Sequence, residues 1–205
     1  MLRKIQYNSP VILTFTLLSA ISLILGQITN NYSTILLFSV YRSSLSSILF
    51  YFRLVGHVLG HADLQHFLSN FLIILLIGPI LEEKYGSRKM IRMMVLTAII
   101  TGLLNVLLFD TALLGASGIA FMLILLSSFV NIKEGRIPLP LILILILFIG
   151  REVVDVFFTE DNISQLTHIV GGLCGGIFGF STNQKNYRIW WFKNFSNSSG
   201  GTGLL

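Results

Sequence analysis

The tetrapeptide Gly115-Ala116-Ser117-Gly118 lies between two long apolar runs, at the end of a break of polar and small residues that begins at Asp110. A serine flanked by glycines has two interpretations. Small residues in an apolar segment can serve helix packing alone in a membrane. Alternatively, the serine hydroxyl can be a nucleophile, which then needs a nearby base. The polar residues that open the neighbouring apolar runs distinguish the two interpretations.

The composition indicates a polytopic membrane protein. Of the 205 residues, 54% are hydrophobic and 11% are charged, and several apolar runs are long enough to span a bilayer. The net charge of +5 comes mostly from Lys and Arg at the ends of these runs. This placement is typical of topology signals and speaks against nucleic acid as a partner. The single Cys174 lies in an apolar run and cannot form an intrachain disulfide.

The pattern of apolar runs predicts an all-α membrane protein of six transmembrane helices. Asn8-Ser9-Pro10 predicts the first helix start, because a capping residue precedes a proline. For residues 27–64 we expect a loop partly embedded in the membrane interface, where aromatic rings are favoured; a seventh span over residues 35–52 is the alternative. The predicted spans are residues 10–26, 64–82, 89–109, 117–131, 137–157 and 165–181, with a charged turn at residues 82–89.

The distribution of cations predicts the orientation. We expect a cytoplasmic amino-terminal segment (1–9), a membrane domain (10–181) and a cytoplasmic tail (182–205). The protein would be a multi-pass protein of the cell membrane. With this orientation, 3 of the 14 Lys and Arg residues lie outside, and the remaining 11 lie inside, in agreement with the positive-inside rule. The three outside are Arg42, Arg53 and Arg151.

In this topology, polar residues of three spans converge at the outer side. His66 and Asn70 open the second span, Ser117 opens the fourth and His168 opens the sixth. The fourth span, at ~1.5 Å per residue, covers roughly 22 Å of a hydrocarbon layer of ~30 Å, which places its serine below the outer surface. Glycines in the sixth span recur every four residues and predict close helix packing, which would bring the histidine to the serine if the fourth span is the partner; they are Gly171, Gly175 and Gly179.

This convergence predicts serine nucleophilic catalysis. His168 is the candidate base for Ser117, and with no evident acidic third member we expect a catalytic dyad. The oxyanion donors would be the Ser117 N–H, the Asn70 amide and the His66 ring. A metal site on the histidines near the second span is an alternative, although structural, hydrogen-bonded side chains are the preferred interpretation of His57 and His61.

Taken together, the motifs resemble those of the rhomboid family of intramembrane serine proteases, over residues 52–180. His61, His66 and Asn70 match a His-x-x-x-x-His-x-x-x-Asn pattern, and the serine tetrapeptide matches Gly-x-Ser-Gly. The further matching residues are Phe52 and Arg53 for a Trp-Arg motif, Glu82 to Gly86 for the turn after the second span, Phe121 for an aromatic residue that packs on the base, and His168, Gly171 and Gly175 for a His-x-x-Gly-x-x-x-Gly motif.

The resemblance implies a six-helix bundle with a water-filled cavity that opens outward. It implies cleavage of single-pass membrane proteins within or near their transmembrane segments, by Ser117 and His168, with no cofactor and no metal. The supporting residues would be Arg53, His61, Glu82, Gly115, Gly118, Phe121, Gly171 and Gly175, and the lateral gate would be residues 137–164. A non-catalytic membrane binder or chaperone of the same fold is the alternative function, and a transporter is a more distant one.

Overall fold

The computed structural model describes residues 7–129, 139, 142–143, 146 and 166–182, and within them the regular structure is helical. An isolated antiparallel bridge joins Val40 to Leu113. The helices are α1 (Pro10–Ile28), α2 (Tyr32–Leu37), α3 (Ile48–Gly56), the 3₁₀ turn η2 (His57–Leu59), α4 (Leu64–Tyr85), α5 (Ser87–Leu108), α6 (Ser117–Ser128) and a helix at Leu166–Thr182.

Three of these helices are long and apolar enough to cross a membrane, namely α1, α4 and α5. They correspond to the first three predicted spans. The segments Ile48–Leu59, Ser117–Ser128 and Leu166–Thr182 are shorter apolar helices. The described part of the chain therefore has the helix content of a multi-pass membrane protein. The predicted fifth span and the predicted gate at residues 137–164 lie outside the described residues, apart from four helical positions.

The first loop contains short helices that the sequence analysis did not predict. After α2, the chain is non-helical until α3 begins at Ile48, so residues 35–52 do not form one continuous spanning helix. Arg53 lies in α3 and is buried, where its Nε donates to the Leu36 carbonyl over 2.7 Å and its guanidinium lies 4.4 Å from the centre of the Tyr41 ring. These contacts tie α3 to α2, through Leu36, and to the segment that follows α2, through Tyr41.

The turn between α4 and α5 is much shorter than the predicted residues 82–89. The α4 helix continues to Tyr85 and α5 begins at Ser87, so that Gly86 alone joins them, with a φ of 83°. Glycine adopts this left-handed region without the steric cost that a side chain would impose. The charged residues at 82–84 and 88–89, which were predicted to form a turn, therefore lie in the last turn of α4 and the first turn of α5.

The start of α1 lies at Pro10, as predicted, but its capping group comes from another helix. The predicted capping residue, Ser9, accepts from Leu13 N–H through its backbone carbonyl. The carboxylate of Glu82 accepts hydrogen bonds from the backbone N–H groups of Val11 and Ile12, each over 3.0 Å, and from the Ser87 hydroxyl over 2.7 Å. A buried carboxylate thus satisfies N–H groups that a helix start leaves without intrahelical partners.

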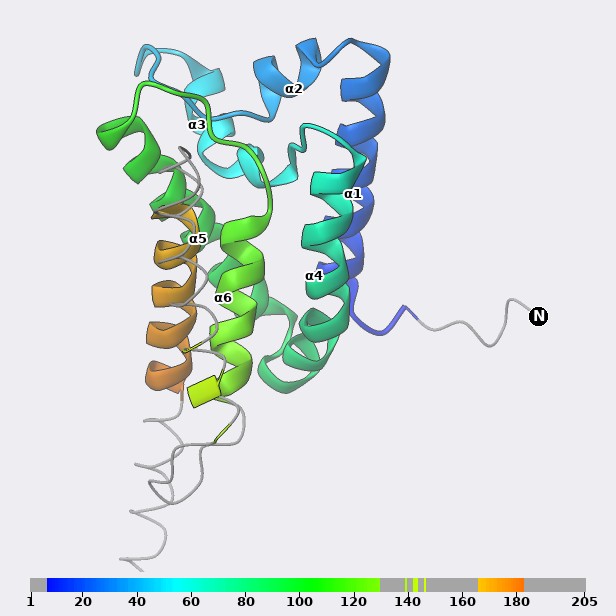
Figure 1. Ribbon diagram of the computed structural model, residues 1–205, viewed down its shortest axis with the longest axis vertical. Helices are drawn as coiled ribbons and strands as arrows, with labels where there is room; N and C mark the ends of the chain where they lie inside the picture. The colour runs from blue at the N-terminus through cyan, green and yellow to red at the C-terminus, as the bar shows by residue number, and fades with distance from the viewer. Residues whose placement is uncertain (1–6, 130–138, 140–141, 144–145, 147–165, 183–205) are drawn as a thin grey trace, which may run out of the picture.

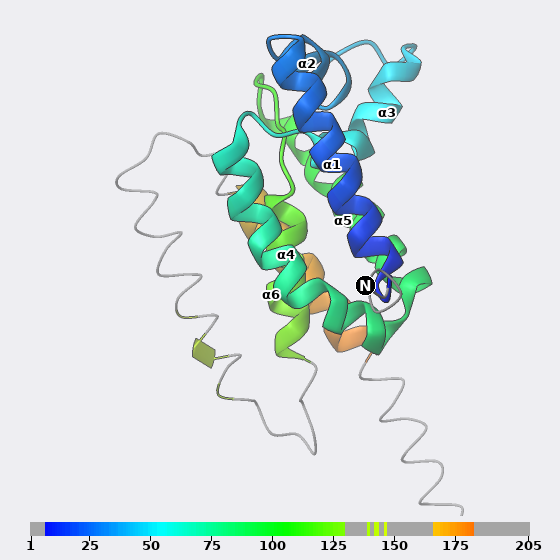
Figure 2. The same cartoon turned by 90° about the vertical axis from the view of Figure 1, so that its right-hand side faces the viewer.

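The α6 helix lies at the centre of the described bundle. Figure 1 shows it between α4 and the helix Leu166–Thr182, with α1 on the outer side of α4; Figure 2 shows α1 and α4 side by side from the other direction. Eight residues of α6 are buried, and they occupy every side of the helix, as expected for a helix surrounded by protein. The position of Ser117 at the first turn of α6 therefore places it inside the bundle.

Candidate active site

Several hydrogen bonds hold the loop that leads into Ser117. The Val40–Leu113 bridge consists of two backbone bonds of 2.9 Å. Further along, Gly115 N–H donates to the His57 carbonyl over 3.0 Å, and Ala116 N–H donates to His61 Nε2 over 3.4 Å. The φ of Gly115 is 121°, a conformation that side-chain-bearing residues rarely adopt. The first loop thus sets the position at which α6 begins.

The glycines of the helix Leu166–Thr182 pack directly on α6. A Cβ atom added to Gly171 would lie 2.2 Å from the Gly118 carbonyl oxygen, and one added to Gly175 would lie 2.1 Å from the Met122 carbonyl oxygen. A Cβ on Gly179 would lie 2.5 Å from the Phe129 ring. The four-residue spacing therefore marks a face at which the two helix backbones touch, and the packing partner is α6, in the predicted fourth span.

This packing brings His168 to the part of α6 that carries Ser117. The ring centre of His168 lies 4.3 Å from that of Phe121, and the two ring planes make an angle of 34°. Phe121 lies four residues after Ser117 in α6, so both side chains project from the same helical face. Ser117 and His168 are both half-buried. The candidate nucleophile and the candidate base therefore lie against one face of α6.

The serine loop is the segment of residues 109–116 that leads into Ser117. His66 and Asn70, in the first two turns of α4, lie against its other side. A Cβ added to Gly115 would lie 2.8 Å from His66 Nε2 and 3.9 Å from Asn70 Nδ2. Asn70 is buried, and its amide nitrogen lies 3.3 Å from His61 Nε2. An amide nitrogen carries two N–H groups, so one can bond to His61 while the second remains available for another acceptor beside the loop.

His61 holds the α4 side chain and the serine loop together. Its Nδ1 lies 3.3 Å from the Leu59 carbonyl, which identifies Nδ1 as the protonated nitrogen and leaves Nε2 to accept from Asn70 and Ala116. Burial lowers the pKa of His61 from 6.5 to about 4, and the charge of nearby His66 acts in the same direction. The neutral imidazole is the form that can accept both hydrogen bonds.

The structure also reveals a polar stripe on α5 that the sequence analysis missed. Asn105 Nδ2 donates to the carbonyls of Val40 and Thr111, over 3.2 and 2.9 Å, and so supports both loops around the serine. One turn earlier, the hydroxyl of Thr101 lies 3.4 Å from His57 Nε2. The detectable signal was the recurrence of polar residues every four positions in an apolar span, at residues 97, 101 and 105.

The alternative metal site is not assembled by the described residues. His57 faces Thr101 and, through Nδ1, the Arg53 carbonyl at 3.2 Å, whereas His61 faces α4. Within residues 7–129 and 166–182, no three His, Cys, Asp or Glu side chains gather in a way that could hold a metal ion. His57 and His61 instead make the structural hydrogen bonds that were the preferred interpretation, and burial also lowers the pKa of His57 to about 4.

Comparison with known proteins identifies relatives of this chain. Residues 49–185 match the model of the rhomboid domain family. The chain is 29% identical over 160 residues to the mouse protein named Rhomboid-related protein 2, an alignment covering 67% of this chain and 52% of the relative. It is 32% identical over 139 residues to Rhomboid-related protein 1 of Caenorhabditis elegans, covering 62% of this chain and 39% of the relative.

The chain thus aligns with only about half, or less, of the length of these curated relatives. The family match covers the segment from α3 to the end of the helix Leu166–Thr182, which includes the serine loop, His66, Asn70 and His168. With the family model matching most of the sequence, this chain belongs to the rhomboid family.

Proposed function

We propose that this protein is an intramembrane serine endopeptidase that cleaves single-pass membrane proteins within or near their transmembrane segments. The observation that supports this most directly is the contact of the His168 ring with Phe121, one turn after Ser117 on α6. Packing of Gly171 on Gly118 establishes the register of this contact. A Ser–His dyad requires a base close to the serine, and a half-buried histidine ring packed one turn from Ser117 on the same face of α6 supports that role for His168.

In the proposed reaction, Ser117 Oγ attacks the carbonyl carbon of the scissile peptide bond while His168 accepts the hydroxyl proton. The tetrahedral intermediate collapses as the C–N bond breaks, and His168 transfers that proton to the leaving amine. A water molecule, deprotonated by His168, then attacks the acyl-enzyme ester; the bond from the acyl carbon to Ser117 Oγ breaks, His168 returns the proton to Oγ, and the second product leaves with a new carboxyl group. The steps use side chains and backbone groups of this chain, with no cofactor or metal ion.

The oxyanion of the intermediate would be bound between the start of α6 and the start of α4. The first N–H groups of an α-helix lack intrahelical partners and carry a partial positive charge, so the N–H of Ser117 is a suitable donor. The second N–H of the Asn70 amide and the ring of His66 lie against Gly115 on the same loop. His61 acts as a positioning residue because it accepts from both Asn70 and the loop.

The proposal includes six transmembrane helices, both termini in the cytoplasm and a location in the cell membrane. It also includes lateral entry of substrate from the bilayer past residues 137–164. These features rest on the cation distribution and on the family resemblance described above. Transmembrane substrates and the surrounding lipid are the expected partners.

The test uses the purified protein in liposomes with a panel of single-pass substrates, together with a serine-reactive fluorescent probe. Ser117→Ala removes the nucleophile and is expected to abolish labelling and cleavage, whereas the matched control Ser127→Ala, on the same helix, retains both. His168→Ala is expected to reduce labelling steeply while the protein stays folded. Asn70→Ala should retain residual activity, because loss of one oxyanion donor costs about 10²–10³-fold in rate.

Two outcomes would contradict the proposal. Cleavage by Ser117→Ala at the wild-type rate would show that another group performs the chemistry. A wild-type protein that binds single-pass substrates but neither cleaves them nor reacts with the probe would instead support the non-catalytic membrane binder of the same fold.

A further inference from the structure

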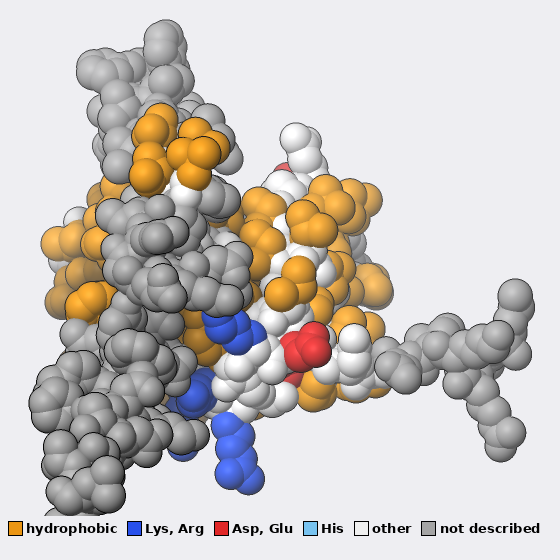
Figure 3. Space-filling model, turned by 90° about the horizontal axis from the view of Figure 1, so that it is seen from below, with side chains coloured by type: hydrophobic (Ala, Val, Ile, Leu, Met, Phe, Trp, Pro, Cys, Tyr) orange, Lys and Arg blue, Asp and Glu red, His pale blue; other side chains and the backbone are white. Residues whose placement is uncertain are grey.

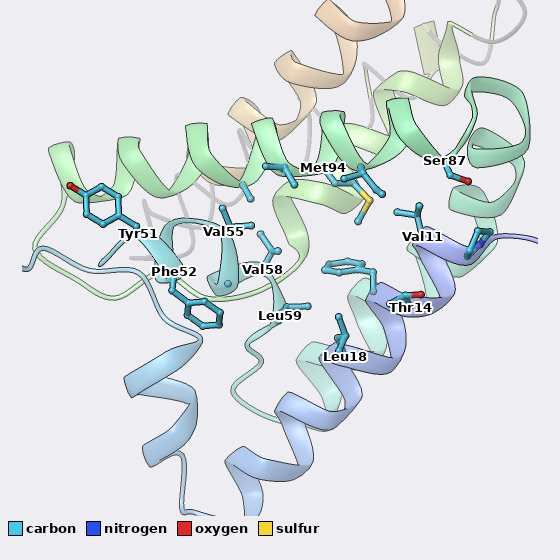
Figure 4. A pocket seen from close by; sticks show the side chains of 16 residues that line it. Val11, Thr14, Leu18, Tyr51, Phe52, Val55, Val58, Leu59, Ser87 and Met94 are labelled. Atoms are coloured by element: carbon cyan, nitrogen blue, oxygen red, sulfur yellow. The ribbon is translucent and has the colours of Figure 1, made fainter. Parts of the chain in front are cut away.

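An apolar groove lies on the side of the bundle away from the candidate active site, between α1 and α5. Its volume is about 760 Å³, within the range of roughly 300–1,000 Å³ typical of small-molecule sites. One wall is formed by α1 and the other by α5, while α3 and η2 close one end, as Figure 4 shows. Among the lining residues are Val11, Leu18, Val55, Leu59, Ile91 and Val95.

The length of the groove matches one leaflet of a bilayer. On α1 it extends from Pro10, the first helical residue, to Leu18 near the middle of the helix. On α5 it extends from Ser87, again the first residue, to Ala98, also near the middle. This distance along α5 is about 16 Å at ~1.5 Å per residue, compared with ~15 Å for half of a ~30 Å hydrocarbon layer. With α1 and α5 spanning a bilayer, the groove would begin at one membrane surface and end near the midplane.

The open end of the groove carries an excess of positive charge. Residues 82–92, around the α4–α5 turn, contain four cations and two carboxylates, and one of these carboxylates, Glu82, is buried against the α1 start. Figure 3 views the molecule from this end and shows Lys and Arg side chains gathered there. Arg88 is exposed and follows the groove residue Ser87 directly, so its cation can reach a group at the mouth of the groove.

We propose that this groove binds an anionic phospholipid, with one acyl chain between α1 and α5 and the phosphate headgroup at the α4–α5 turn near Arg88. The apolar walls match a hydrocarbon chain, the one-leaflet length matches a chain that starts at the surface, and the cations complement the phosphate. The bound lipid would link α1, the first loop and α5 on the face opposite to the serine. The proposal is independent of proteolytic activity, and the tests below measure lipid directly.

The first test is native mass spectrometry of the protein after detergent extraction from liposomes of phosphatidylglycerol and phosphatidylcholine in equal amounts. The wild-type protein is expected to retain phosphatidylglycerol in excess. Val95→Trp places a bulky side chain in the groove and should remove the retained lipid. The control Leu96→Trp is on the exposed side of the same helix, does not line the groove and should retain the lipid as the wild type does.

A charge reversal tests the headgroup position. Arg88→Glu should lower phosphatidylglycerol retention by about fivefold or more, because each basic residue near a membrane surface contributes about 1 kcal/mol of attraction to anionic lipid, which corresponds to about fivefold in binding. Lys89→Glu makes the same change in net charge but lies about 200° around α5 from Ser87, and should have a much smaller effect.

A third measurement does not depend on lipid surviving extraction. A photo-cross-linking amino acid at Leu18, in the groove, should attach to phosphatidylglycerol in the membrane more efficiently than one at Leu17, an adjacent exposed leucine outside it. Equal retention of the two lipids, or equal retention by Val95→Trp and Leu96→Trp, would overturn the proposal. Cross-linking of Leu18 to a second copy of the chain or to a substrate would overturn it as well, because another occupant would then fill the groove.

Discussion

Replacement of Gly171 by alanine tests whether the helix contact positions the candidate base. A Cβ at this position would lie 2.2 Å from the Gly118 carbonyl oxygen, and real Cβ atoms essentially never approach closer than 3.0 Å. The two backbones must therefore separate by at least 0.8 Å (3.0 minus 2.2) at this point. His168 lies three residues earlier on the same helix and would move with it, so its distance from Ser117 would change.

The expected magnitude follows from this displacement. A misplacement of about 1 Å in an active site can cost about 10²-fold in rate, and we expect a loss of that order in substrate cleavage and probe labelling by Gly171→Ala. Overpacking typically costs about 1–3 kcal/mol, while alanine in place of glycine in a helix gains up to ~1 kcal/mol. The free energy of unfolding should therefore fall by between about 0 and 3 kcal/mol, while activity is largely lost.

Gly176→Ala is the matched control, because a Cβ at Gly176 would meet nothing within 4 Å. The same substitution on the same helix should leave activity unchanged and the melting temperature in detergent equal or higher. The assay compares probe-labelling rates, substrate cleavage and melting curves of both variants with the wild type. Wild-type labelling by Gly171→Ala, or an equal loss in both variants, would refute the inference that this glycine contact positions His168.

Three further predictions concern stability and topology. Glu82→Gln should lower the free energy of unfolding by about 1–3 kcal/mol, because the carboxylate accepts hydrogen bonds from backbone N–H groups at the α1 start. Glu83→Gln, at the exposed neighbouring position, should have almost no effect in the same melting assay. Equal destabilisation by the two substitutions would contradict the capping role of Glu82. The pKa values of His57 and His61 lie near 4, below the ordinary 6.5. The free energy of unfolding should therefore be at its full value above about pH 6.5 and should decline by about 3 kcal/mol for each histidine as the pH falls toward 4. A melting temperature that does not change across this range would show that neither histidine is buried in its neutral form. A reporter fused after Leu205 should be active only on the cytoplasmic side, and activity only outside would reverse the proposed orientation.

Much of the candidate site could be predicted from spacing along the chain. The Gly-x-Ser-Gly tetrapeptide, the histidine at the head of a glycine repeat and the His66–Asn70 pair are local patterns, and the helix period alone determines which of their side chains share a face. The spans at α1, α4 and α5 could also be read from apolar run length, because a bilayer requires about 20 apolar residues in a helix.

The tertiary structure was needed wherever a polar group is satisfied by a residue distant in the sequence. The Glu82 carboxylate caps α1 from about 70 positions away, and Asn105 holds the Val40 carbonyl across a separation of 65 residues; neither pairing leaves a local pattern. The same holds for His61, whose spacing marked it as a family position while its bonds to Asn70 and Ala116 depend on how α4 meets the serine loop. Local periodicity is determined by backbone geometry, and so the sequence alone specifies it. Which elements satisfy each other's buried hydrogen-bonding groups depends on packing in three dimensions, and so only the folded bundle decides it.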